Sequence, residues 1–263
     1  MRKFTLLIFA ITFGLSAYSQ WVVKDSITGP ADRIEIDNLD HIYKVVNTEV
    51  FKYNKKGELL FRYSDKQLGN IGHIDVTYPL RPLLLYPELN YLVILDNTMS
   101  NNRGQINLLD HNIGLGLLAC SSVQNHFWFY DAMKFALIRT DENFKEVSST
   151  GNLAQILGIE LNPTSMTEFA NRLYVMNPST GIMVFDIFGT YIKTIPVTGI
   201  TDFQVFENEI AYLDKNTLIR YNTLLFELKE IELPYICKSA QIQKNSLILL
   251  TDQKILILEK PKL

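Results

Sequence analysis

The four histidines of this 263-residue chain are the side chains that most often bind metals in proteins. His41, His73, His111 and His126 lie far apart in the sequence, and none takes part in an H-E-x-x-H or C-x-x-C arrangement. Three of them would meet at one metal only if the fold brought distant segments to a single point. The spacing therefore predicts no metal site.

Nucleophile and phosphate-binding motifs are missing from the sequence as well. There is no G-x-S-x-G turn for a serine nucleophile, no G-x-x-x-x-G-K-S/T loop and no G-x-G-x-x-G. Gly114 and Gly116 stand alone, which is typical of a bend in a strand. We therefore expect no catalytic residue, no cofactor and no enzymatic activity.

Cys120 and Cys237 are the only thiols of the chain. A pair of cysteines in an exported protein favours a disulfide, but bonding requires the two Cα atoms to approach within about 7 Å. The repeat described below places the two residues in well-separated units. We expect both to be unpaired, with a disulfide as the alternative.

The N-terminus has the three parts of a secretory signal peptide. Arg2 and Lys3 precede an apolar run from residue 4 to 15, and the small residues Ala17 and Ser19 follow it. The run is shorter than the roughly 20 apolar residues that span a bilayer. We expect cleavage after Ser19, with an uncleaved anchor as the alternative, and no membrane-spanning segment in the mature chain.

The charge balance of the mature chain argues against a nucleic-acid partner. Removal of Arg2 and Lys3 lowers the basic count from 25 to 23 against 28 acidic residues, which gives a net charge of about −5. The basic residues are scattered and form no clustered surface. We therefore predict no nucleic-acid partner.

Apolar and polar residues alternate in runs of five to seven, which is typical of β-strands. Six segments share one pattern, in which an apolar strand is followed by Asn, Asp or Glu. They begin at Val50, Ile106, Leu137, Ile182, Leu218 and Ile255. Their mean spacing of 41 residues falls in the range of propeller blades, which is roughly 40 to 50 residues. The Asp and Asn residues that end the preceding strands are interpreted as turn formers rather than metal ligands.

The last repeat is incomplete, because the chain ends a few residues after Leu258. The run from Trp21 to Ser26 looks like a strand and has no place in the first unit. Pairing it with residues 255–258 would complete the last sheet and cover its edge. We therefore predict that residues 20–263 form one β-propeller domain of about six blades, closed by an N-terminal strand.

Two irregular segments are candidate partner-binding loops, because such loops commonly carry recognition. The segment from 64 to 85 is poor in repeat pattern, and the loop from 98 to 103 is longer than its equivalents. The candidate interface residues are Tyr78, Arg81, Pro82, Met99, Asn101 and Arg103. The aromatic run 126–130 is instead expected to pack between blades.

Several segments resemble known propeller families. Residues 34–38, 42–45 and 51–60 are similar to the short repeats of NHL modules. Residues 78–87, 92–97, 103–108 and 184–190, together with the signal peptide ending at Ser19, resemble a periplasmic protein family of Bacteroidota. This is the family of plug subunits that close the outer-membrane translocon of type IX secretion. The resemblance implies a periplasmic location peripheral to the outer membrane, the translocon β-barrel protein as partner, and no chemistry of its own.

Two other functions stay open. A lactonase-like periplasmic enzyme would need polar groups on the inner strands, which we predict at residues 33–38, 83–88, 166–170, 202–207 and 239–243. These strands contain the acidic residues Asp37, Glu88, Glu168, Asp202 and Glu207. A module that binds glycans or another envelope component is the third possibility.

Overall fold

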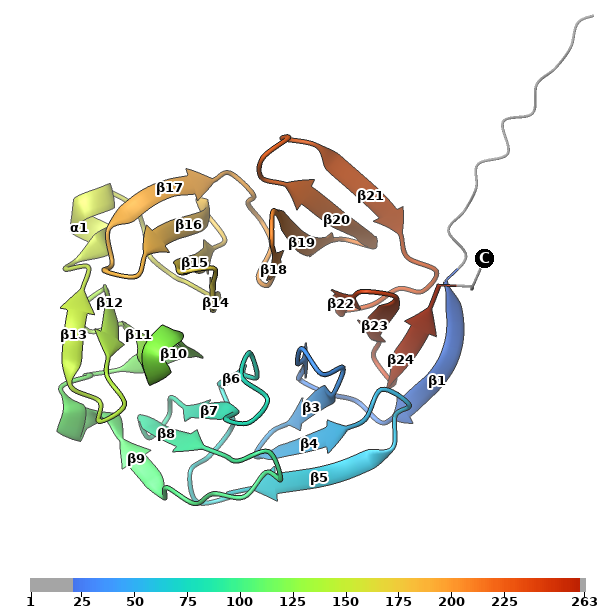
Figure 1. The fold of residues 1–263 in the computed structure, drawn as a ribbon, viewed down its shortest axis with the longest axis horizontal. Coiled ribbons are helices and arrows are strands. Elements are labelled where there is room, and N and C mark those ends of the chain that lie inside the picture. Colours follow the sequence, from blue (N-terminus) through green and yellow to red (C-terminus); the bar gives the residue numbers. More distant parts are fainter. Residues whose placement is uncertain (1–20, 261–263) are drawn as a thin grey trace, which may run out of the picture.

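The computed structural model describes residues 21–260, which form six four-stranded antiparallel sheets arranged in a ring (Figure 1). Each sheet is one blade, and one of its two edge strands lies next to the centre of the ring. The all-β propeller predicted from the repeat is therefore confirmed. The predicted signal peptide, residues 1–19, lies outside the described residues.

In the first three blades the strands follow the chain from the centre of the ring outward. Blade 1 contains β2 (Arg33–Ile36), β3 (Ile42–Val46), β4 (Glu49–Tyr53) and β5 (Leu59–Ser64). Blade 2 contains β6 (His73–Asp75), β7 (Leu83–Tyr86), β8 (Tyr91–Ile94) and β9 (Gln105–Asn107). Blade 3 contains β10 (Gly116–Ser121), β11 (Phe127–Asp131), β12 (Ala136–Thr140) and β13 (Glu146–Ser149).

The other three blades are also ordered from the centre outward, and the last ends with the N-terminal strand. Blade 4 contains β14 (Ser165–Phe169), β15 (Arg172–Asn177), β16 (Gly181–Asp186) and β17 (Tyr191–Ile195). Blade 5 contains β18 (Gln204–Phe206), β19 (Glu209–Asp214), β20 (Thr217–Asn222) and β21 (Leu228–Glu232). Blade 6 contains β22 (Ser239–Gln243), β23 (Ser246–Leu250), β24 (Lys254–Glu259) and β1 (Val22–Thr28). Short helical turns are α1 (Leu153–Leu157), Leu108–His111 and Val123–Asn125.

The core consists of six apolar clusters, one between each pair of neighbouring blades. Strand β11 shows why its sequence is so aromatic. Phe127 and Phe129 pack toward blade 2, while Trp128 and Tyr130 pack toward blade 4. Successive side chains of a strand point to opposite faces, so a strand buried on both faces needs a continuous apolar run. The predicted packing of these rings between blades is confirmed.

The N-terminal strand closes the ring as predicted. Strand β1 pairs antiparallel with β24, with Val22 opposite Glu259 and Ile27 opposite Ile255. Ile27 is 4% exposed and joins the cluster between blades 6 and 1, and Trp21 joins the cluster between blades 5 and 6. The first strand thus supplies both backbone pairing and core side chains.

The strand order predicted for blade 2 is wrong. Ile106 lies on the outer strand β9, whereas the matching repeats begin third strands, and residues 83–86 form the second strand rather than the inner one. The true equivalent of the repeat aspartate is Asp96, whose Oδ1 accepts hydrogen bonds from the backbone N–H groups of Thr98 and Ser100. The same hydrogen bonds form in three other blades, where the side-chain Oδ1 accepts from the backbone N–H groups two and four residues later; these residues are Asn54, Asp141 and Asp186. The inner strand β6 escaped prediction because it has only three residues.

Both cysteines are free, as predicted. Cys120 is buried between blades 3 and 4, and Cys237 is half-buried beside the cluster between blades 5 and 6. Burial raises the pKa of the Cys237 thiol to about 11. In residues 21–260, no helix is both long enough and apolar enough to cross a membrane.

Ring closure can be tested by two substitutions on β1. Ile27→Ala removes a buried side chain between blades 6 and 1, so we expect the free energy of unfolding to fall by about 2–5 kcal/mol. The control Val22→Ala alters an exposed side chain on the same strand and should change it by less than about 0.5 kcal/mol. Urea unfolding of both variants measures the difference. Equal losses would contradict the closing role of Ile27.

Candidate functional site

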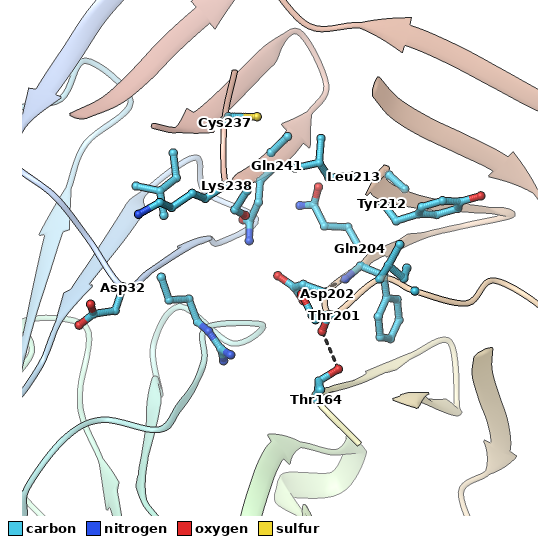
Figure 2. Close-up of a pocket in the computed structure, with 18 of the residues that line it drawn as sticks. Asp32, Thr164, Thr201, Asp202, Gln204, Tyr212, Leu213, Cys237, Lys238 and Gln241 are labelled. Atoms are coloured by element: carbon cyan, nitrogen blue, oxygen red, sulfur yellow. Dashed lines mark hydrogen bonds between the residues drawn. The ribbon is translucent and has the colours of Figure 1, made fainter. Parts of the chain in front are cut away.

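Two cavities lie at the centre of the ring and meet at Asp202, Phe203 and Gln204. The upper cavity, about 650 Å³, is lined by residues at the starts of the inner strands, and the lower cavity, about 290 Å³, by residues at their ends. We call the corresponding sides of the ring the upper and lower faces. Figure 2 shows the upper cavity, with Thr164 donating a hydrogen bond to the carbonyl of Thr201. The two cavities together form a central channel.

Polar side chains around the channel connect neighbouring inner strands. Gln204 Oε1 accepts a hydrogen bond from the N–H of Ile242 at 2.8 Å, and Asp75 Oδ2 accepts one from the N–H of Ser121 at 2.7 Å. An inner strand has no strand partner on its channel side, and unpaired backbone groups there need other partners. These side chains therefore have a structural role between blades.

Glu168 accepts three hydrogen bonds, as many as Asp75 does. It accepts hydrogen bonds from Ser122 Oγ, from the N–H of Val123 and from Trp128 Nε1, all in blade 3. Arg139 donates to the same Ser122 Oγ at 2.9 Å, which brings a positive charge near this carboxylate. Glu168 thus holds blades 3 and 4 together and has little capacity left for a ligand.

Glu35 has the most perturbed acidity among the channel carboxyls. Burial and, next, the negative charge of Asp202 raise the pKa of Glu35 to about 8, against weaker lowering effects of Arg33 and Gln241. Gln241 Nε2 donates a hydrogen bond to Glu35 Oε2 at 2.9 Å. Glu35 is therefore mainly protonated at neutral pH.

His73 lies on the neighbouring inner strand and is neutral. Burial, followed by the positive charge of Arg33, lowers the pKa of His73 to about 3. Its side chain is only 5% exposed, and its Nδ1 atom has no hydrogen-bond partner among residues 21–260. Within the same residues, no group of three His, Cys, Asp or Glu side chains is arranged to hold a metal ion.

The predicted inner-strand acids end up in different places. Only Glu168 and Asp202 line a cavity of the channel. Asp37 is buried in the turn after β2, where it bonds His41 and Tyr43, while Glu88 and Glu207 are in turns at the surface.

Sequence reasoning missed two of the channel carboxyls, Glu35 and Asp75. The two-residue alternation of β2 places Arg33 and Glu35 on one face of the strand, opposite the core residue Ile34, and this signal was available for Glu35. Asp75 was missed because the strand that carries it, β6, was not predicted.

The two candidate loops lie on the same face of the ring. The turn from β6 to β7 carries Tyr78 and Arg81, and the loop from β8 to β9 carries Arg103, so both open on the lower face. The Arg81 guanidinium lies 4.7 Å from the ring centroid of Phe127 and 5.6 Å from that of Tyr78. Burial and then the positive charge of Arg103 lower the pKa of Arg81. Tyr78, Arg81 and Arg103 are thus gathered beside blades 2 and 3.

The remaining candidate residues are less accessible. Met99 is 2% exposed and packs in the cluster between blades 1 and 2, and Pro82 is buried directly before β7, the second strand of blade 2. Asn101 is half-buried. Arg81 is also half-buried, whereas Tyr78 and Arg103 are exposed. Tyr78 and Arg103 are therefore the members of the set best placed to meet a partner without a rearrangement of the loops.

Comparisons with known proteins give the fold but no family. No protein-family model matches the sequence, and no curated protein matches it either. Three propellers of known structure are similar, each at 10% identity or less. The Pan2 WD40 domain of Neurospora crassa has a TM-score of 0.61 and 8% identity, and the match covers 92% of this chain and 96% of that one. A gluconolactonase from Xanthomonas campestris has a TM-score of 0.60 and 10% identity, with 91% and 88% covered. BamB from Moraxella catarrhalis has a TM-score of 0.56 and 10% identity, with 91% and 100% covered.

The acidity of Glu35 predicts a pH-dependent stability. A carboxyl whose pKa is raised on folding contributes stability below its unfolded pKa, and this contribution is lost as the pH rises to the folded value. Between about pH 4.5 and 8, Glu35 should therefore lower the free energy of unfolding by up to about 1.4 kcal/mol per pH unit. Glu35→Gln keeps the shape and removes this titration, so its curve should be flatter. Parallel curves for the two proteins in urea unfolding would refute the assignment.

Proposed function

We propose that this chain is the periplasmic subunit that binds and seals the periplasmic opening of the type IX secretion translocon, an outer-membrane β-barrel protein. The resemblance of residues 78–87, 92–97, 103–108 and 184–190 to that family supports the proposal. The observation that carries it is the lower face of the ring, which combines the two candidate loops with exposed apolar turns.

The apolar turns of the lower face come from three blades. Leu80 follows β6 in blade 2, Phe188 is at the turn after β16 in blade 4, and Leu224, Leu225 and Phe226 form the turn after β20 in blade 5. The exposed fractions of these five side chains range from 64% to 73%. Exposed apolar groups can mark a protein contact. The upper face also exposes apolar side chains, among them Met133 and Ile236, so the lower face is distinguished by the combination of these turns with the two candidate loops.

The polar groups around these turns fit a contact that must be broken during export. Arg81 and Arg103 lie in two loops of blade 2, and Glu207 and Glu227 flank the apolar turn of blade 5. Apolar contacts with a polar rim are typical of interfaces that form and separate, whereas permanent interfaces are larger and more apolar. A seal of this kind needs a rigid body and no catalytic step. The proposal places the protein in the periplasm, peripheral to the outer membrane.

The contact face can be tested with matched aspartate substitutions. Phe226→Asp adds a charge to an exposed lower-face turn, so we expect less co-purification with the translocon and greater uptake of small dyes or antibiotics by the cells. Ile236→Asp is the control, because Ile236 is 86% exposed on the upper face, before β22. Its effect on both measurements should be small.

Deletion of the gene tests the function itself. Cells that still assemble the translocon should become permeable to small dyes when the protein is missing. Normal permeability, together with no co-purification of the wild-type protein, would show that the sealing function is wrong.

A second candidate is a lactone-hydrolysing enzyme, favoured by the neighbouring carboxyls of Glu35 and Asp202 in the channel. The gluconolactonase of similar fold is an enzyme of that kind. If this candidate is correct, purified protein should open gluconolactone faster than buffer does, and Glu35→Gln or Asp202→Asn should abolish the difference. A rate equal to that of buffer, with and without divalent metals, would eliminate it.

A further inference from the structure

Five turns of the lower face share one backbone conformation. In each of blades 1 to 5, the turn between the third and fourth strands begins with Asn or Asp, whose carbonyl accepts a hydrogen bond from the N–H of a residue with positive φ. These residues are Gly57, Met99, Phe144, Gly189 and Phe226. Glycine adopts the left-handed region without steric cost, whereas a residue with a Cβ atom does not. The three residues with side chains therefore need a contact that offsets this cost.

Two of the three side chains have such a contact within the ring, and the third does not. Met99 is 2% exposed in the cluster between blades 1 and 2. Phe144 is 8% exposed, and its ring is stacked on that of Phe127 with 5.2 Å between the centroids. Phe226 is 73% exposed. A bulky residue in the left-handed region is an outlier, and an outlier that the fold does not stabilise points to a function.

Hydrogen bonds hold the turn that carries Phe226. Asn222 Oδ1 accepts from the N–H groups of Leu224 and Leu225, at 3.0 and 2.9 Å. The N–H of Thr223 donates to a carbonyl of the turn after β18 at 2.7 Å. The backbone of the turn thus keeps three apolar side chains in solvent, each at least 64% exposed.

A groove of about 380 Å³ adjoins this turn on the lower face, between blades 5 and 6. Asn222, the first residue of the turn, is part of its lining, and Phe206 and Ile242 contribute apolar surface. Phe226 of the same chain is not among the lining residues. A protein cavity of about 150 Å³ can hold benzene, so the groove has room for a phenylalanine ring from another molecule.

The charges beside the turn and in the groove are complementary. Glu227 and Lys229 follow the apolar turn along the chain. Glu207 and Lys244 line the groove, whose other two charged side chains pair with each other. Among the ion pairs found in residues 21–260, none involves these four side chains. Each surface thus offers one carboxylate and one ammonium group, and two copies of the chain can pair opposite charges in both directions.

We propose that two copies of this chain associate through blade 5, each inserting Phe226 into the groove between blades 5 and 6 of the other. Because the turn and the groove lie side by side on one surface, a two-fold axis allows both insertions at once. Insertion gives Phe226 the burial that Met99 and Phe144 have within the ring. The contact is small, so the dimer should form and separate reversibly. The inference concerns the protein alone and does not rest on the sealing function.

Analytical ultracentrifugation of the full mature protein tests the association. The mean mass should rise from that of a monomer toward that of a dimer as the protein concentration increases. High salt should weaken the association, because it screens the exposed charge pairs.

Two matched substitutions connect the dimer to Phe226. Phe226→Asn should weaken dimerisation by about tenfold or more, because it removes the aromatic anchor. Its melting temperature at low protein concentration should not fall below that of the wild type, since Asn tolerates the left-handed region. Phe188→Asn is the control, because Phe188 is 68% exposed in the corresponding turn of blade 4. It should keep the wild-type dimerisation.

A charge exchange connects the turn to the groove. Glu227→Lys and Lys244→Glu should each weaken dimerisation severalfold, because each variant places like charges opposite each other. The chain that carries both substitutions should regain the dimer, since the pairs are again opposite in sign. Glu232→Gln, at the other end of β21, should have no effect.

Two results would overturn the proposal. One is a dimer that keeps its affinity in Phe226→Asn, or that the double charge exchange does not restore. The other is a wild-type protein that stays monomeric at every concentration. In that case, reduced co-purification of Phe226→Asn with the translocon would show that the translocon covers the turn, and reduced binding to phospholipid vesicles would show that a membrane does.

Discussion

The pairing of β1 with β24 is the contact on which the rest of the ring depends. Every blade is apolar on both faces, so each needs a neighbour on either side to bury its core clusters. An open row of six such sheets would leave two apolar faces in water at an unfavourable free energy of about 25 cal/mol per Å². Closure removes both faces at once, and the strand that completes blade 6 also fills the clusters on either side of it.

The polar character of the channel follows from the same architecture. Sheets packed around a ring bury their faces, but the channel-side edge of each inner strand has no strand to pair with. Gln204, Asp75 and Gln241 supply the missing partners across the gaps between blades. A carboxyl or amide near the centre of this propeller is therefore first a structural group. Glu35 differs from the other channel carboxyls because burial and the negative charge of Asp202 raise its pKa to about 8.

The sequence predicted the architecture well because alternation and spacing are repeated in every blade. The closing strand was predictable from the incomplete last repeat, and the aromatic run 127–130 from its position in a strand buried on both sides. Blade 2 was misplaced because β6 is short and the loop after β8 is long, so the repeat was matched one strand too late. The channel was harder to predict, because its charges come from segments far apart in the chain. Neither Glu35 beside Asp202 nor the burial of Met99 can be inferred from local pattern alone.

The position of β1 also determines the order in which this molecule can fold. Val22 is among the first described residues that a ribosome would make, and its partner Glu259 is among the last. Contacts between distant segments form slowly, because a long loop must close before they contribute. Until then, β24 has an open edge and the first and last blades lack their common neighbour, which makes such chains prone to aggregation. The ring therefore cannot close until β24 has been synthesised, and a product that lacks either β1 or β24 would keep an unpaired strand.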